Sequence, residues 1–116
     1  MLFDGVGIIA ILTSAGSSPR LLLQKQFRPP IGKICVEVPA GLVDANETAQ
    51  ECALRELYEE TGYRGTIEEG MELSCLMFND PGMCNTNLHI VHVKVDLEEE
   101  ANKNPQPKLE ENEVGE

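Results

Sequence analysis

Residues 41–63, GLVDANETAQECALRELYEETGY, constrain the fold of this chain more than any other part of its sequence. Thr48 followed three residues later by Glu51 fits a capping box, which begins a helix. Gly62 fits the left-handed residue at which helices commonly end. The segment therefore predicts a turn and one helix with defined ends, against which the rest of the chain must pack.

The pattern before this helix is mostly that of strands. Residues 5–13 are rich in β-branched side chains and predict a strand buried on both faces. Residues 14–19 form a turn cluster and residues 21–27 a second strand, so together they predict a hairpin. Residues 34–38 predict a short strand in which Glu37 points away from its aliphatic neighbours.

The second half of the chain has fewer regular elements. Residues 65–77 predict one or two short strands, and residues 87–95 alternate well enough for a longer one. Residues 96–112 are polar and contain proline, which predicts a loop or a mobile segment, and Glu113 begins a further expected strand. About six strands and one helix predict an α+β fold with a mixed or antiparallel sheet.

The charge balance restricts the classes of partner. The chain of 116 residues carries a formal net charge of −11, which disfavours nonspecific binding to nucleic acid. No apolar run approaches the roughly 18 residues that span a bilayer, and residues 1–16 lack the basic start of a secretory signal. The sequence therefore predicts neither a nucleic-acid partner nor a membrane.

The four cysteines are widely spaced and form no Cys-x-x-Cys pair, which argues against a zinc site. Thiols that stay reduced suggest an intracellular compartment. An acidic protein can still act on an anionic small molecule if its site supplies cations, either arginine and lysine side chains or a bound metal.

Carboxylates crowd one side of the predicted helix. At about 100° per residue, Glu56 and Glu60 nearly coincide and Glu59 lies on their flank. A like-charged pair four residues apart costs roughly 0.2–0.5 kcal/mol, and a divalent cation between the carboxylates would reverse that effect. Oxygen ligands without histidine or cysteine favour Mg²⁺ or Mn²⁺. Arg55 can pair with Glu59 and Glu51, and a solvated acidic face is the alternative interpretation.

The spacing of these residues resembles the signature of the Nudix hydrolase family. The matching positions are Gly41, Glu47, Arg55, Glu56, Leu57, Glu59, Glu60, Gly62 and Tyr63. The resemblance implies the α+β Nudix fold, a mixed β-sheet with a loop–helix–loop that binds Mg²⁺ or Mn²⁺. It also implies hydrolysis of a nucleoside diphosphate linked to another group, and it makes the solvated face the weaker interpretation.

The flanking residues are similar to the ADP-ribose and ADP-sugar pyrophosphatases of that family. The stretch QKQFRPPIGKICVEVPAGLVD, residues 24–44, carries most of this similarity. It implies a nucleotide-sugar substrate that is hydrolysed to AMP and a sugar phosphate by water attack at phosphorus. It also implies that the parent protein is a homodimer, and the expected location is the cytoplasm and also the nucleus. The alternative is a Nudix-fold domain without catalytic activity that binds nucleotides or has a regulatory role.

The resemblance implies roles for single residues around the metal. Glu56, Glu59 and Glu60 would hold two or three Mg²⁺ or Mn²⁺ ions together with the backbone carbonyl of Ala40. Glu59 and Glu60 are expected to be catalytic through these ions. The residues implied to keep the loop–helix–loop in shape are Gly41, Glu47, Arg55 and Gly62.

Further roles are implied for the substrate and the attacking water. Arg28 would meet the diphosphate, Glu37 would contact the nucleotide, and Asp80 would lie near the terminal sugar. A glutamate far beyond the helix is implied to activate the water. Glu113 is the best match for this base, and the alternatives are Glu110 and Glu111.

Residues 1–116 are expected to form a single Nudix hydrolase domain that lacks an N-terminal dimerisation segment and a C-terminal strand and helix. The sequence starts almost inside one strand and stops as another is expected, which predicts that part of a larger protein is missing. An inactive fragment of the enzyme is therefore a further alternative. The sequence does not distinguish ADP-ribose from ADP-mannose or ADP-glucose as substrate.

Overall fold

The structure, a computed structural model, describes residues 4–71 and 73–107. In chain order its elements are β1 (Asp4–Thr13), β2 (Arg20–Leu21), β3 (Gln24–Arg28), the 3₁₀ turn η1 (Pro29–Ile31), β4 (Lys33–Glu37), β5 (Ala40–Leu42), α1 (Ala49–Thr61), β6 (Thr66–Ile67), β7 (Met77–Phe78), β8 (Asn87–Asp96) and the 3₁₀ turn η2 (Glu100–Asn102). The expected α+β fold with one helix is confirmed.

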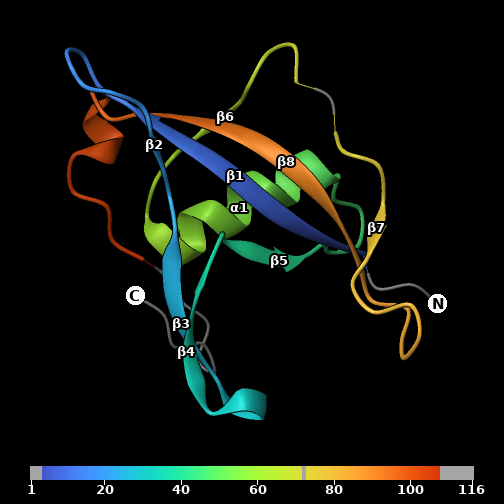
Figure 1. Ribbon diagram of the computed structural model, residues 1–116. Helices are drawn as coiled ribbons and strands as arrows, with labels where there is room; N and C mark the ends of the chain where they lie inside the picture. Colours follow the sequence, from blue (N-terminus) through green and yellow to red (C-terminus); the bar gives the residue numbers. More distant parts are fainter. Residues whose placement is uncertain (1–3, 72, 108–116) are drawn as a thin grey trace.

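The main sheet is built around its two longest strands, β1 and β8, which run parallel and side by side (Figure 1). Their pairing stays in register over ten residues, from Asp4 opposite Asn87 to Thr13 opposite Asp96. The short strands β2 and β5 pair antiparallel with β1, and β6 and β7 pair antiparallel with β8. The sheet is therefore mixed, as predicted.

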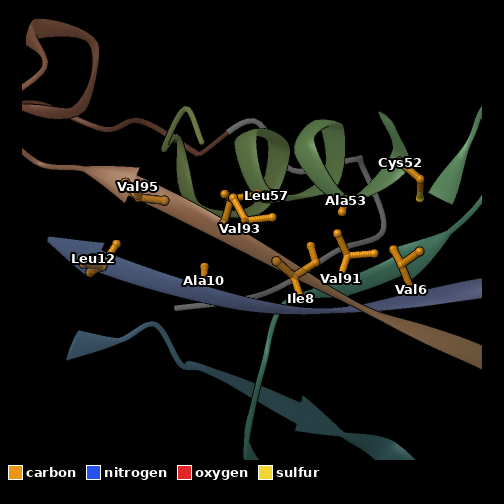
Figure 2. Packing of buried hydrophobic residues seen from close by; sticks show 10 residues of the cluster. All are labelled: Val6, Ile8, Ala10, Leu12, Cys52, Ala53, Leu57, Val91, Val93 and Val95. Carbon is orange, nitrogen blue, oxygen red and sulfur yellow. The ribbon is translucent and has the colours of Figure 1, made fainter. Parts of the chain in front are cut away.

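Helix α1 covers one face of this sheet and closes the hydrophobic core. Leu57, Ala53 and Cys52 point from the helix toward the sheet (Figure 2). The other core residues are Val6, Ile8, Ala10, Leu12, Val91, Val93 and Val95. No helix in the described part of the chain is long and apolar enough to cross a bilayer.

A separate hairpin of β3 and β4 projects away from the main sheet (Figure 1). The prediction of one strand over residues 21–27 is wrong, because the chain bonds to β1 only as far as Leu22 and then continues into β3. The turn at Pro29–Ile31 ends at Gly32, which has a left-handed φ of 64°. This turn folds β3 back on β4, so the two strands bond to each other instead of extending the main sheet.

The side chains of β4 alternate as predicted, but its aliphatic side chains face outward. Ile34 and Val36 are 66% and 63% exposed, whereas Cys35 and Glu37 are partly buried. Because Lys25 pairs with Val36 and Phe27 with Ile34, these four residues share one side of the hairpin. We call this side the outer hairpin face. The opposite, inner face carries Glu37.

The described segment after β8 is a loop, as predicted, and it contains the short turn η2. Asn102 in η2 is buried, and its side-chain oxygen accepts a hydrogen bond of 2.7 Å from the backbone N–H of Arg64. The backbone of Gln106 lies so close to Gly62 that no Cβ would fit there. These contacts hold residues 96–106 against the end of α1. The expected strand at Glu113 lies outside the described residues.

Candidate active site

The loop–helix–loop at the candidate site is fixed by local hydrogen bonds at both ends of α1. The Thr48 hydroxyl accepts from the backbone N–H of Glu51 at 3.1 Å, and the Glu51 carboxylate accepts from the Thr48 N–H at 3.3 Å. Gly62 has a φ of 81° and donates its backbone N–H to Tyr58 at 2.8 Å. The predicted capping box and left-handed stop are both present.

Glu56 lies directly against the strand that precedes the helix. Glu56 is only 8% exposed, and it lies beside the buried helix residues Ala53 and Leu57. A Cβ added to Gly41 would overlap the Glu56 side chain. Glycine at position 41 therefore allows the helix carboxylate to reach the backbone of β5.

Arg55 connects the loop and the helix. Its Nε and Nη2 donate to the two carboxylate oxygens of Glu47 at 2.7 and 3.0 Å, so this ion pair is bidentate. Its Nη1 donates to Glu56 at 3.0 Å and to Glu59 at 3.3 Å. Nη2 also lies 3.4 Å from Asp44. One guanidinium thus touches four carboxylates and cannot neutralise them all.

This arginine changes the titration of its partner. The hydrogen bond from Arg55, opposed in part by burial, lowers the pKa of Glu47 from about 4.5 to about 2. The same hydrogen bond raises the pKa of Arg55. Both groups are therefore charged at neutral pH, and Arg55 is held in place. The predicted pairing of Arg55 with Glu51 is absent because the Glu51 carboxylate caps the helix.

Glu60, one turn beyond Glu56, reaches the same strand. Its Oε2 accepts a hydrogen bond of 3.2 Å from the backbone N–H of Ala40. The structure therefore brings Glu56 and Glu60 to adjacent residues of β5, Gly41 and Ala40. Glu59 lies beside Glu56 and Glu60, and its carboxylate accepts a hydrogen bond from Arg55.

The donor chemistry at this place fits a hard divalent cation. The possible metal ligands here are two carboxylates and backbone carbonyl groups. All of them bind through oxygen, which Mg²⁺ and Mn²⁺ prefer. Among the described residues, however, no three His, Cys, Asp or Glu side chains converge as a ready metal-binding group. In this structure Arg55 donates to Glu56 and the Ala40 N–H donates to Glu60, so a bound ion would compete with these hydrogen bonds.

Arg28 and Glu37 are joined on the inner face of the hairpin. Nε and Nη2 of Arg28 donate to the two carboxylate oxygens of Glu37 at 2.8 and 2.7 Å. The hydrogen bond to Glu37 raises the pKa of Arg28, and the negative charge of Glu60 adds to this effect. The Arg28 guanidinium therefore interacts electrostatically with one carboxylate of α1, that of Glu60.

A cavity of about 370 Å³ lies between the hairpin, β5 and the start of β8. The residues that line it include Arg28, Ala40, Gly41, Asn79 and Asn87. Its position beside β5 makes it the candidate place for a ligand that also meets Glu56 and Glu60.

Asp80 does not line this cavity but follows Asn79, which does. Its backbone oxygen accepts from the N–H groups of Met83 and Cys84 at 3.0 and 2.9 Å, so it begins a turn. The candidate bases Glu113, Glu110 and Glu111 lie outside the described residues.

Asn87 is a residue of this cavity that the sequence did not single out. It is 3% exposed, and its Oδ1 has no hydrogen-bond partner although its Nδ2 donates to Asn85 at 3.0 Å. A polar residue at a position of β8 that shares the buried side of Val91 and Val93 is the signal that could have found it.

Comparisons with known proteins agree with this geometry. The chain is 51% identical over 111 residues to the ADP-ribose pyrophosphatase of Saccharomyces cerevisiae, which covers 95% of this chain and 47% of that protein. It is 40% identical over 105 residues to the ADP-sugar pyrophosphatase of Mus musculus, which covers 90% of this chain and 47% of that protein. The chain thus spans about half the length of the curated relatives it matches.

The fold also resembles that of a solved structure. The crystal structure of an ADP compounds hydrolase superposes with a TM-score of 0.66 at 22% identity, over 90% of this chain and 52% of that one. The family model of the NUDIX domain matches residues 1–116. The signature on α1, the mixed sheet and these matches together show that the chain belongs to the Nudix family.

Proposed function

We propose that this protein hydrolyses the diphosphate of ADP-ribose or a related ADP-sugar to AMP and a sugar phosphate, with the help of a divalent cation. The observation that carries the proposal is the approach of Glu56 and Glu60 to Gly41 and Ala40 beside a cavity that Arg28 lines. A diphosphate is negatively charged and needs positive charge to bind to an acidic protein. An arginine and carboxylates that hold metal cations can supply that charge. The names of the relatives from yeast and mouse support the substrate class.

Each residue has a role in this reaction. Glu56, Glu60 and the Ala40 carbonyl would hold Mg²⁺ or Mn²⁺, with Glu59 beside them, and two or three ions are proposed. When bound, such ions neutralise the diphosphate and lower the pKa of a coordinated water. Arg28 binds the diphosphate oxygens and stabilises the charge that develops on them. Asp80, which begins the turn after Asn79, is proposed to lie near the terminal sugar.

The chemical step is an attack of water on one phosphorus. The water oxygen forms the new bond to that phosphorus, and the bond from the phosphorus to the bridging oxygen breaks. The bridging oxygen leaves with the other phosphate, which gives AMP and a sugar phosphate. Glu113 is proposed to take the proton from the water, and Glu110 and Glu111 remain alternatives for this base.

The experiment is incubation of the protein with ADP-ribose and Mg²⁺, followed by chromatographic separation of AMP. Glu60→Gln is expected to reduce the rate by at least about 100-fold, whereas Glu69→Gln, which removes the same charge near the far end of β8, leaves it unchanged. ADP-mannose and ADP-glucose in parallel reactions identify the preferred sugar. Binding of ADP-ribose without any release of AMP would instead indicate the silent binding domain.

We also propose that the protein is a homodimer that acts in the cytoplasm or the nucleus, with no nucleic acid or membrane as partner. The outer hairpin face supports the dimer, since Phe27, Ile34 and Val36 are each more than half exposed. An isolated two-stranded hairpin is marginally stable in water, so a second copy packed on this face would stabilise it. Four free cysteines suit a reducing compartment.

A further inference from the structure

Arg28 and Glu37 lie on the same face of the β3–β4 hairpin but at opposite ends of it. Arg28 is opposite Lys33 next to the turn, and Glu37 is opposite Gln24 where the hairpin joins the body of the protein. Four residues along a strand separate these two levels, a distance of about 13 Å. Their side chains nevertheless form a bidentate ion pair, with bonds of 2.8 and 2.7 Å. The Arg28 side chain must therefore run back along the hairpin from its tip toward its base.

The base of the hairpin adjoins the candidate active site. Glu37 precedes Ala40 by three residues, and Ala40 binds the Glu60 carboxylate through its N–H. Arg28 lines the cavity together with Ala40 and Gly41, although its own Cα belongs to the projecting end of the hairpin. Lys33, directly opposite Arg28, is a like charge and disfavours a guanidinium that stays at the tip.

We propose that Glu37 is a positioning residue that draws the guanidinium of Arg28 from the tip of the hairpin to the cavity beside Ala40. In this role Glu37 acts through Arg28 instead of contacting the nucleotide itself. The identity of the ligand that Arg28 binds rests on the proposed function. The effect of Glu37 on the position of Arg28 does not depend on it.

Two other roles for this ion pair make different predictions. An exposed ion pair can be energetically neutral, in which case the loss of Glu37 changes nothing at the site. Glu37 could also compete with an anionic substrate for Arg28, in which case its loss strengthens substrate binding. A positioning role predicts instead that the loss of Glu37 weakens the action of Arg28 on the substrate, because an arginine that is free at the hairpin tip no longer meets the diphosphate.

The first test observes Arg28 directly and needs no catalysis. In ¹⁵N-resolved NMR spectra of the metal-free protein, the Nε–H signal of Arg28 is expected to exchange slowly with water, because the carboxylate holds it. Glu37→Ala is expected to move this signal and speed its exchange at least about tenfold, while the signal of Arg55 stays in place. An unchanged Arg28 signal in Glu37→Ala overturns the proposal.

The second test uses a double-mutant cycle for hydrolysis of ADP-ribose. Glu37→Ala and Arg28→Ala are each expected to lower kcat/KM by about 10-fold to 100-fold, and the double variant by no more than Arg28→Ala alone. Glu37→Gln, which keeps one oxygen acceptor, should recover part of the loss. Additive effects, or a lower KM in Glu37→Ala, overturn the proposal. If the wild type releases no AMP, the proposed function fails, and the NMR test still shows whether Glu37 holds the Arg28 side chain.

Discussion

The backbone of Gly41 lies against the side chain of Glu56, so closely that a methyl group at position 41 would overlap the carboxylate. The two positions are 15 residues apart in the sequence. The contact therefore fixes how α1 sits on β5, and it brings the most buried carboxylate of the helix against Gly41, which lines the cavity.

Gly41→Ala is expected to push Glu56 and the first turns of α1 away from β5. Such overpacking costs about 1–3 kcal/mol in the free energy of unfolding, and hydrolysis should fall with it. Thermal unfolding and AMP release measure the two effects. Gly82→Ala is the matched control, because a Cβ there has only Asp80 nearby, at 3.9 Å. Equal behaviour of the two variants would contradict the contact.

The ion pair between Glu47 and Arg55 predicts a dependence of stability on pH. The pKa of Glu47 is lowered in the folded protein from about 4.5 to about 2, so its contribution is complete above pH 4.5 and disappears as the pH falls toward 2. Glu47→Gln should lower the free energy of unfolding by about 1–3 kcal/mol at pH 7 and by much less at pH 2.5. Urea denaturation at both pH values measures this. The same loss at both would show that the charge is not responsible, and Glu69→Gln serves as the charge control.

Asn87 and Asn102 are equally buried, at 3% exposure, and form a matched pair. Asn102 makes three hydrogen bonds to backbone groups of Arg64 and Asp96, so Asn102→Leu should cost about 2–4 kcal/mol. Asn87 makes one bond to Asn85 and leaves Oδ1 unpaired, so Asn87→Leu should change stability by less than about 1 kcal/mol. Chemical denaturation compares the two. A larger cost at Asn87 would show that its oxygen has a partner.

Binding of Mg²⁺ should stabilise the folded protein. At about 100 times its Kd the ion adds roughly 2.7 kcal/mol, which raises Tm by about 10 °C. Glu56→Gln and Glu60→Gln should lose most of this increase, and NaCl at the same ionic strength should not produce it. Differential scanning calorimetry records the shift. If both variants gain as much as the wild type, the ion binds elsewhere.

The outer hairpin face predicts the state of association. Val36→Lys should convert a dimer to a monomer in sedimentation experiments, because it places a charge in the centre of the proposed contact. Met83→Lys is the control, since Met83 is 83% exposed on a different loop. A wild-type protein that is monomeric at all concentrations, or a dimer that persists in Val36→Lys, would refute this interface.

The local features of the fold could be predicted from the sequence. The capping box at Thr48 and the stop at Gly62 depend on residues a few positions apart, and both are present. The pairing of the strands could not be predicted in the same way. Residues 21–27 have the composition of one strand, but their hydrogen bonds go to two different partners, β1 and β4.

The same limit applied to the candidate site. Alternation in β4 correctly separated Glu37 from Ile34 and Val36, but alternation alone cannot say which side meets solvent. Spacing on the helix allowed Arg55 to reach Glu51, yet the helix cap already occupies that carboxylate. The link between Arg28 and Glu37 depends on the register of the hairpin, which no local pattern reveals.

The parallel pairing of β1 with β8 has a consequence for synthesis of the protein. Asp4 cannot find its neighbour Asn87 until 83 further residues have been made, and the core on this sheet stays open until then. Contacts so distant in sequence make folding slow. A nascent chain that stops before β8 should therefore emerge from the ribosome with Val6 and Ile8 exposed, ready for a chaperone and accessible to proteases.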